Sequence, residues 1–121
     1  AMSTVLSPDE LLKTVRIPKL PRETRWGFRK LSRKPGDFAQ SLAVVIVGGD
    51  VSVVIGATPD GLVPLPRVAK YLGEVDTLAE DSEDDLETEF CEDVSGIDLD
   101  FYEQQIHWST LSRAIKDVFD K

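Results

Sequence analysis

The stretch LAVVIVGGDVSVVI, residues 42–55, carries the strongest structural signal in the chain. Leu42–Val47 is apolar and rich in β-branched residues, which predicts a strand buried on both faces in the middle of a sheet. Gly48 and Gly49 tolerate the backbone angles of a tight reversal, and Val51–Ile55 returns as the partner strand. A β-hairpin is therefore expected at the centre of the fold.

A further strand is predicted immediately before this hairpin. Thr24–Ser32 is rich in aromatic and basic residues, and Pro35-Gly36-Asp37 then interrupts the pattern. Because a strand directs alternate side chains to opposite faces, Arg29 and Arg33 are expected on one face and Lys30 on the other. The basic cluster of this segment is thus expected to be divided between two faces: Arg25, Arg29, Lys30, Arg33 and Lys34.

The N-terminal segment carries the signals of a short helix followed by a strand. Ser7 as N-cap, Pro8 at the first helical position and Glu10 three residues after the cap are typical of a helix start. Thr14–Ile17 then alternates polar and apolar residues as a half-buried strand does. The prolines that follow predict an extended link to the next strand.

A turn and two helices are predicted downstream of the hairpin. Thr58–Gly61 has the composition of a turn, and Arg67–Leu72 is expected to form a short helix that Gly73 closes. The last helix is expected over Ile106–Phe119, where apolar residues recur at spacings of three and four: Trp108, Leu111, Ile115 and Val118.

The segment 74–93 is strongly acidic, with eleven Asp and Glu among its twenty residues. Such a composition buries too little apolar surface to offset the entropy cost of ordering, so we expect a mobile insertion or at most a frayed helix. The 121 residues suffice for one modest core. Residues 1–121 are therefore expected to form a single domain that carries this acidic insertion.

Composition limits the partners and the compartment. Residues 1–36 carry nine Lys and Arg against three Asp and Glu, whereas the remainder carries five against nineteen. This acidic remainder would repel a polyanion, so no nucleic-acid partner is expected. No apolar run approaches the length that spans a membrane, so no membrane partner is expected either. Cys91 is the only cysteine, which excludes an intramolecular disulfide and favours a cytoplasmic location.

Signals for catalysis or metal binding are weak. His107 is the only histidine, so a nucleophilic triad has a single possible base, and a position on a helix surface is expected instead. One Cys and one His do not form a zinc site. Gly56–Gly61 has the glycine spacing of a phosphate-binding loop without its lysine, and the acidic segment lacks the glycine of a calcium loop. We therefore expect no catalytic residue and no metal site.

The stretch GFRKLSRKPGDFAQSLAVVIV, residues 27–47, contains a second pattern. Before its apolar strand come, in order, an aromatic residue, a lysine, an Arg-Lys pair and the run Gly36–Ala39. In this order they resemble the opening of the C-terminal domain of the FAD-binding (medium) subunit of molybdenum hydroxylases, the carbon monoxide dehydrogenase and xanthine dehydrogenase group. Upstream, TVLSPDELLKTVRIPKLP resembles that family's link from the FAD-binding region. Downstream, VIGATPDGLVPLPRVAKYLG is similar to its strand, turn and short helix. The resemblance covers roughly Thr4–Gly73.

The resemblance implies an α+β fold, in which a small antiparallel sheet of three to four strands carries helices on one face. It also implies a place beside FAD, with Lys30 and Arg33 as the first candidates for cofactor binding and Arg29 as the third. Asp37 is given a structural role at the break before the buried strand. The alternative is that all four side chains are only structural.

The implied function is that of a component of an FAD-dependent oxidoreductase. Its partners would be an FAD-binding domain or subunit and the iron–sulfur and molybdopterin subunits of a hydroxylase complex. The family's Gly-rich pyrophosphate loop has no counterpart in the sequence, so the chain alone is expected to bind FAD weakly or not at all and not to be catalytic. A different hypothesis is a stand-alone interaction module of the same fold, with the acidic segment as its contact surface.

Overall fold

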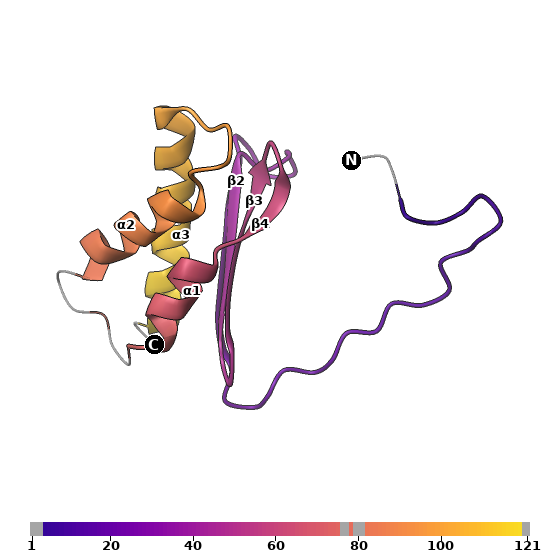
Figure 1. The fold of residues 1–121 in the computed structure, drawn as a ribbon, viewed down its shortest axis with the longest axis horizontal. Helices are drawn as coiled ribbons and strands as arrows, with labels where there is room; N and C mark the ends of the chain where they lie inside the picture. The colour runs from indigo at the N-terminus through magenta and orange to yellow at the C-terminus, as the bar shows by residue number, and fades with distance from the viewer. Residues whose placement is uncertain (1–3, 76–77, 79–81, 120–121) are drawn as a thin grey trace.

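The computed structural model describes residues 4–75, 78 and 82–119. Within them, four strands are followed by three helices, so the fold is α+β as expected. The strands are β1 (Arg25–Leu31), β2 (Ser41–Val47), β3 (Val51–Thr58) and β4 (Gly61–Pro64), and the helices are α1 (Pro66–Gly73), α2 (Ser82–Asp93) and α3 (Phe101–Phe119). The helices lie on one side of the sheet, and the N-terminal segment extends away on the other (Figure 1).

The predicted hairpin is confirmed as β2 and β3, the two inner strands of the sheet. The strand order is β1-β2-β3-β4, and each strand is antiparallel to its neighbours. Ala43 pairs with Ile55 and Val45 with Val53, and all four side chains are buried beneath the helices. The alternate residues of β2 are only half-buried. The prediction that this strand is buried on both faces is therefore wrong, because the helices cover a single face.

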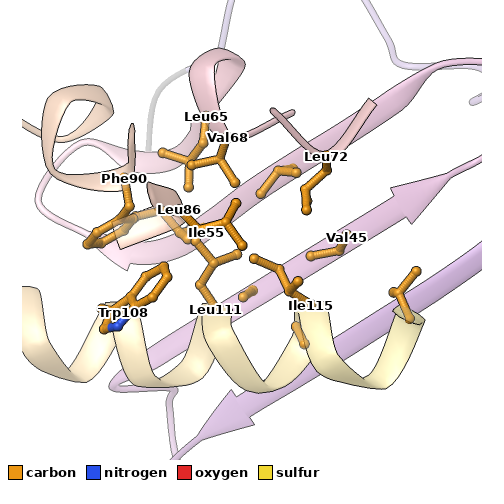
Figure 2. Close-up of a cluster of buried hydrophobic side chains, with 14 of the residues drawn as sticks. Val45, Ile55, Leu65, Val68, Leu72, Leu86, Phe90, Trp108, Leu111 and Ile115 are labelled. Atoms are coloured by element: carbon orange, nitrogen blue, oxygen red, sulfur yellow. The ribbon is translucent and has the colours of Figure 1, made fainter. Parts of the chain in front are cut away.

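The core is built from the covered face of the sheet and from all three helices. Leu111 and Ile115 of α3 are buried against it, which confirms the predicted apolar spacing. The helix begins at Phe101, earlier than predicted, and the predicted short helix is confirmed as α1. Figure 2 shows the side chains that meet in this core: Val45, Ile55, Leu65, Val68, Leu72, Leu86, Phe90, Trp108, Leu111 and Ile115.

The acidic segment, for which a mobile insertion or a frayed helix was expected, contains a helix that contributes to the core. Residues 82–93 form α2, in which Leu86 and Phe90, four residues apart, are buried. The Asp93 carboxylate accepts the backbone N–H groups of Arg67 at 3.2 and 3.1 Å and of Val68 at 3.1 Å. These bonds satisfy donors at the start of α1. Of the two expected alternatives, residues 82–93 thus form the helix and not the loop, and the expected mobility of the segment stays a prediction. Residues 76–77 and 79–81 lie outside the described residues.

The predicted N-terminal helix and strand do not form. The Ser7 N–H donates to Glu10 Oε1 at 2.7 Å, and the Glu10 N–H donates to the Ser7 carbonyl at 3.0 Å. These capping contacts close a turn, but residues 10–24 contain no regular element. Both predictions are wrong because the apolar side chains that would support the two elements stay exposed: Val5, Leu11, Leu12, Val15, Ile17 and Leu20.

β1 approaches α3 closely at Gly27. A Cβ atom at this position would lie 2.4 Å from the Ala114 carbonyl oxygen and 3.0 Å from Val118 Cγ2. Only glycine lets the strand and the helix backbone come this near. This contact packs the first strand directly against the last helix on the helix-covered side of the sheet.

Candidate functional site

β1 divides the basic cluster between two faces, as the alternation predicts. Gly27 faces α3, so Arg25 and Arg29, two residues before and after it, lie on the helix-covered side. Lys30 lies on the opposite, open face of the sheet. Arg33 follows the end of β1 in the loop to β2. The three candidate cofactor contacts therefore do not form one continuous group.

The two arginines on the covered side bind the end of α3. Arg29 Nε and Nη2 donate to the Asp117 carboxylate at 2.6 and 2.8 Å. This hydrogen bond and the charge of Asp117 raise the pKa of the Arg29 guanidinium. Arg25 Nη1 donates to the Val118 carbonyl at 3.5 Å, and its guanidinium carbon lies 5.2 Å from the centre of the Phe119 ring. Arg29 remains a predicted cofactor contact, but here its guanidinium holds β1 to α3.

Lys30 shares the open face of β1 with two aromatic residues. Trp26 lies opposite Ile46 and Phe28 opposite Val44, so their side chains emerge on the same face as Lys30. Trp26 is 61% exposed and Phe28 49% exposed. A cation beside two exposed rings can contact a flat, electron-rich group by stacking and by charge.

Arg33 lines a hollow of about 360 Å³ together with Tyr102, Glu103 and His107. The hollow combines a cation, a carboxylate and an imidazole, so its polarity is mixed. Arg33 thus lines this hollow, whereas Lys30 lies on the open face of the sheet. The two first candidates for cofactor binding therefore belong to different surfaces. Their role as a pair stays a prediction.

The structure reveals a buried Ser–His pair that sequence reasoning missed. His107 is 2% exposed, and its Nδ1 lies 2.7 Å from Ser41 Oγ at the start of β2. The expectation that this histidine lies on a helix surface is wrong. Its position four residues before Leu111, on the same face of α3, is the signal that could have placed it inside.

Burial lowers the pKa of His107. As the pH falls through about 6.5, the ordinary value, the unfolded chain takes up this proton before the folded chain does. The histidine is thus expected to make the free energy of unfolding fall with falling pH, and to have no such effect above the ordinary value. Urea unfolding of the wild type and of His107→Gln between about pH 7.5 and pH 5 checks this sign. An equal pH dependence in both proteins would contradict it.

The loop between β1 and β2 confirms the predicted break. Gly36 has a φ of 88°, a left-handed conformation that favours glycine. The Asp37 N–H donates to the Lys34 carbonyl at 3.1 Å, and the Gln40 N–H donates to the Leu31 carbonyl at 2.7 Å. These bonds fix the loop that returns the chain from the basic strand to the central strand.

The described residues contain neither a cluster of metal ligands nor a membrane-spanning helix. Among residues 4–75, 78 and 82–119, no three His, Cys, Asp or Glu side chains gather as metal ligands would. In the same part of the chain, no helix combines the length and the apolar character needed to cross a membrane.

Comparison with known proteins identifies similar subunits of two dehydrogenases. The chain is 40% identical over 50 residues to the caffeine dehydrogenase subunit beta of Pseudomonas sp. (strain CBB1). It is 38% identical over 69 residues to the carbon monoxide dehydrogenase medium chain of Afipia carboxidovorans. These matches cover 41% and 54% of this chain, but only 17% and 24% of the two relatives. No protein-family model matches the chain.

Solved structures share the fold. Reconstituted CO dehydrogenase from Oligotropha carboxidovorans matches with a TM-score of 0.69 and 21% identity, over 86% of this chain and 40% of that one. The carbon monoxide dehydrogenase of Hydrogenophaga pseudoflava that lacks the Mo-pyranopterin moiety matches with a TM-score of 0.68 and 16% identity, over 86% of this chain and 39% of that one. The resemblance to the carbon monoxide dehydrogenase flavoprotein that the motifs predict is confirmed. The chain spans well under half the length of these relatives.

Proposed function

We propose that the chain is the C-terminal domain of a flavoprotein subunit in a molybdenum hydroxylase-type oxidoreductase, where it closes over FAD and docks partner subunits for electron transfer. The observation that carries the proposal is the position of the family-like motif. Its residues occupy β1 and the following loop, and Lys30 lies on an uncovered sheet face next to Phe28, with Trp26 further along the same strand. A cytoplasmic location, which the single cysteine favours, belongs to this proposal.

The described residues fit one part of FAD. Trp26 and Phe28 offer flat apolar contact, and the Lys30 ammonium can donate to a ring oxygen or nitrogen. No glycine-rich loop that could hold the pyrophosphate occurs in the sequence. When bound to the complete subunit, FAD would supply the electron-transfer chemistry. The part played by this chain is to cover the ring and to favour negative charge on it through a nearby cation.

The proposal predicts that the chain needs a second component to retain FAD. Alone, it is expected to elute from gel filtration with little bound flavin. After mixing with the FAD-binding region of a carbon monoxide dehydrogenase-type medium subunit, the flavin absorbance that co-elutes with the complex is expected to exceed that of either component. No gain in bound FAD would count against the proposal.

Lys30 has a specific expected effect in that mixture. Lys30→Met is expected to weaken FAD retention by about tenfold, because a hydrogen bond from a charged donor contributes about 1.5–3 kcal/mol. Lys70→Met, at an exposed position of α1, is the matched control and is expected to change nothing. Flavin titration followed by fluorescence measures both. If the two variants retain FAD equally, Lys30 is not a contact.

The competing hypothesis of an acidic contact module has less support from the contacts of α2. Arg67 Nε binds Glu89 at 2.8 Å and Nη2 binds Glu92 at 3.1 Å, while Asp93 caps α1. A large part of the acidic helix is thus engaged within the chain. Removing the exposed charges of Asp84 and Glu83 should leave partner binding nearly unchanged under the flavoprotein proposal, and a pull-down with that double alanine variant tests it.

A further inference from the structure

The open face of the sheet is apolar along its whole width. Directly opposed residues share a face, so the register assigns the members of this surface: Trp26, Phe28, Lys30, Leu42, Val44, Ile46, Ser52, Val54, Gly56 and Pro64. Leu62 joins them, because a Cβ at Gly56 would meet both Leu42 Cδ1 at 2.8 Å and Leu62 Cδ2 at 2.9 Å. We call this set the open face. Its only charged member is Lys30.

No described element covers this surface. All three helices pack on the opposite side of the sheet (Figure 1). Leu62 is 70% exposed, and the valines and isoleucine of the inner strands are only half-buried. Monomeric proteins rarely leave a contiguous apolar surface of this kind in water, and such a surface usually marks a contact with another body.

The N-terminal segment points to the side on which that body lies. Residues 4–24 run outward on the side of the sheet away from the helices (Figure 1). Val5, Leu11 and Ile17 are almost fully exposed along this segment. Two uncovered apolar surfaces, the open face and this segment, therefore lie on one side of the molecule and are joined at β1.

Charge restricts the kind of partner. The segment and the open face carry five exposed cations, none of which forms an ion pair with a residue in the described ranges: Lys13, Arg16, Lys19, Arg22 and Lys30. The same segment carries three exposed carboxylates, Asp9, Glu10 and Glu23, so the surface as a whole is net positive. Two copies of the chain that met through this side would bring these cations together, which is unfavourable. A partner with an apolar centre and an acidic rim would complement both the surface and its charges.

We infer that the open face and residues 4–24 together form the docking surface for the flavin-binding region of the subunit, and that the helical side faces away from it. The inference rests on the proposed function and names the surface that meets this partner. The solved relatives are about two and a half times as long as the part that matches this chain, so they contain a further body of the required size. The partner region is expected to present apolar side chains to Phe28 and Leu62 and carboxylates to the five cations.

Photo-cross-linking in the cells that produce the protein tests the surface directly. Phe28 or Leu62 on the open face is replaced by p-benzoylphenylalanine, and Ser109 or Arg113 on the exposed side of α3 serves as the matched control. Cross-linked peptides are identified by mass spectrometry, and FAD is measured in the cross-linked species. We expect at least tenfold more product with a flavin-containing polypeptide region from positions 28 and 62 than from positions 109 and 113.

Each outcome separates the inference from the proposed function. Cross-links to a flavin-containing region that arise mainly from α3 would overturn the inference and leave the proposed function standing. A second copy of the chain trapped from position 28 would overturn the inference. If no flavin-containing region is trapped from any of the four positions, the proposed function itself fails.

A second experiment introduces a negative charge into the open face. Phe28→Asp places a carboxylate on the open face at a half-exposed position, so the fold has room for it. It is expected to reduce co-purification of the flavin-containing region by about tenfold or more, as the loss of a central interface residue does. Ser109→Asp is the control and should retain wild-type yield. Equal yields from Phe28→Asp and the wild type, with both proteins folded by circular dichroism, would overturn the inference.

Discussion

Phe90→Ala is expected to lower the free energy of unfolding by about 3–5 kcal/mol, the usual cost of removing a buried phenylalanine ring. Phe90 is fully buried, and its ring centre lies 5.6 Å from that of Trp108. The substitution would leave a cavity where α2 meets α3. Urea unfolding followed by circular dichroism measures the loss, since Trp108 fluorescence would report the local change instead.

The same variant tests whether the acidic segment belongs to the core. If α2 were an insertion detached from the rest of the domain, Phe90→Ala would cost almost nothing. Asp84→Ala, on the exposed side of the same helix, is the matched control and is expected to change the free energy of unfolding by less than about 0.5 kcal/mol. A loss below about 1 kcal/mol for Phe90→Ala would contradict the packing of α2.

Gly27→Ala is expected to destabilise the fold by about 3 kcal/mol, at the upper end of the range for overpacking. The added methyl group would stand 2.4 Å from the Ala114 carbonyl oxygen, which is backbone and cannot move aside by a change of rotamer. β1 and α3 would have to separate, so the ion pair of Arg29 with Asp117 would also be strained. Thermal and urea unfolding of the variant check the expected loss.

Gly49→Ala is the control for this substitution. No heavy atom lies within 4 Å of a Cβ at Gly49, and its φ is not in the left-handed region. Alanine there is expected to be neutral or to stabilise the fold by about 0.4–1 kcal/mol, because it restricts the unfolded chain. If the alanines at positions 27 and 49 had the same effect, the close approach of β1 to α3 would be refuted.

The central elements of the fold could be predicted because their patterns are local. The apolar run of β2, the two glycines before β3 and the helical spacing of Leu111 and Ile115 each depend on neighbours within a few residues. The acidic helix could not be predicted from composition, because its order depends on a few contacts with distant segments. Leu86 and Phe90 reach a core that distant segments build.

The candidate site, too, could be predicted from the sequence only in part. Alternation along β1 correctly predicted that Lys30 and Arg29 lie on opposite faces. The engagement of Arg29 by Asp117 was beyond prediction, because 88 residues separate the two in the chain. The Ser41–His107 contact likewise joins residues 66 positions apart.

The order of residues in the chain is sufficient for the hairpin, the last helix, the break at Gly36 and the resemblance to the carbon monoxide dehydrogenase flavoprotein, since each depends on local pattern and backbone preference. The face of the sheet that stays open, the burial of His107 and the order of α2 depend on which surfaces meet in space. The hydrophobic effect is non-directional and favours any contact that removes apolar surface area from water. These features therefore follow from the assembled fold. In the exposed N-terminal segment, by contrast, the local pattern is not sufficient. Its sequence resembles a helix followed by a strand, but neither element forms without a surface to pack on.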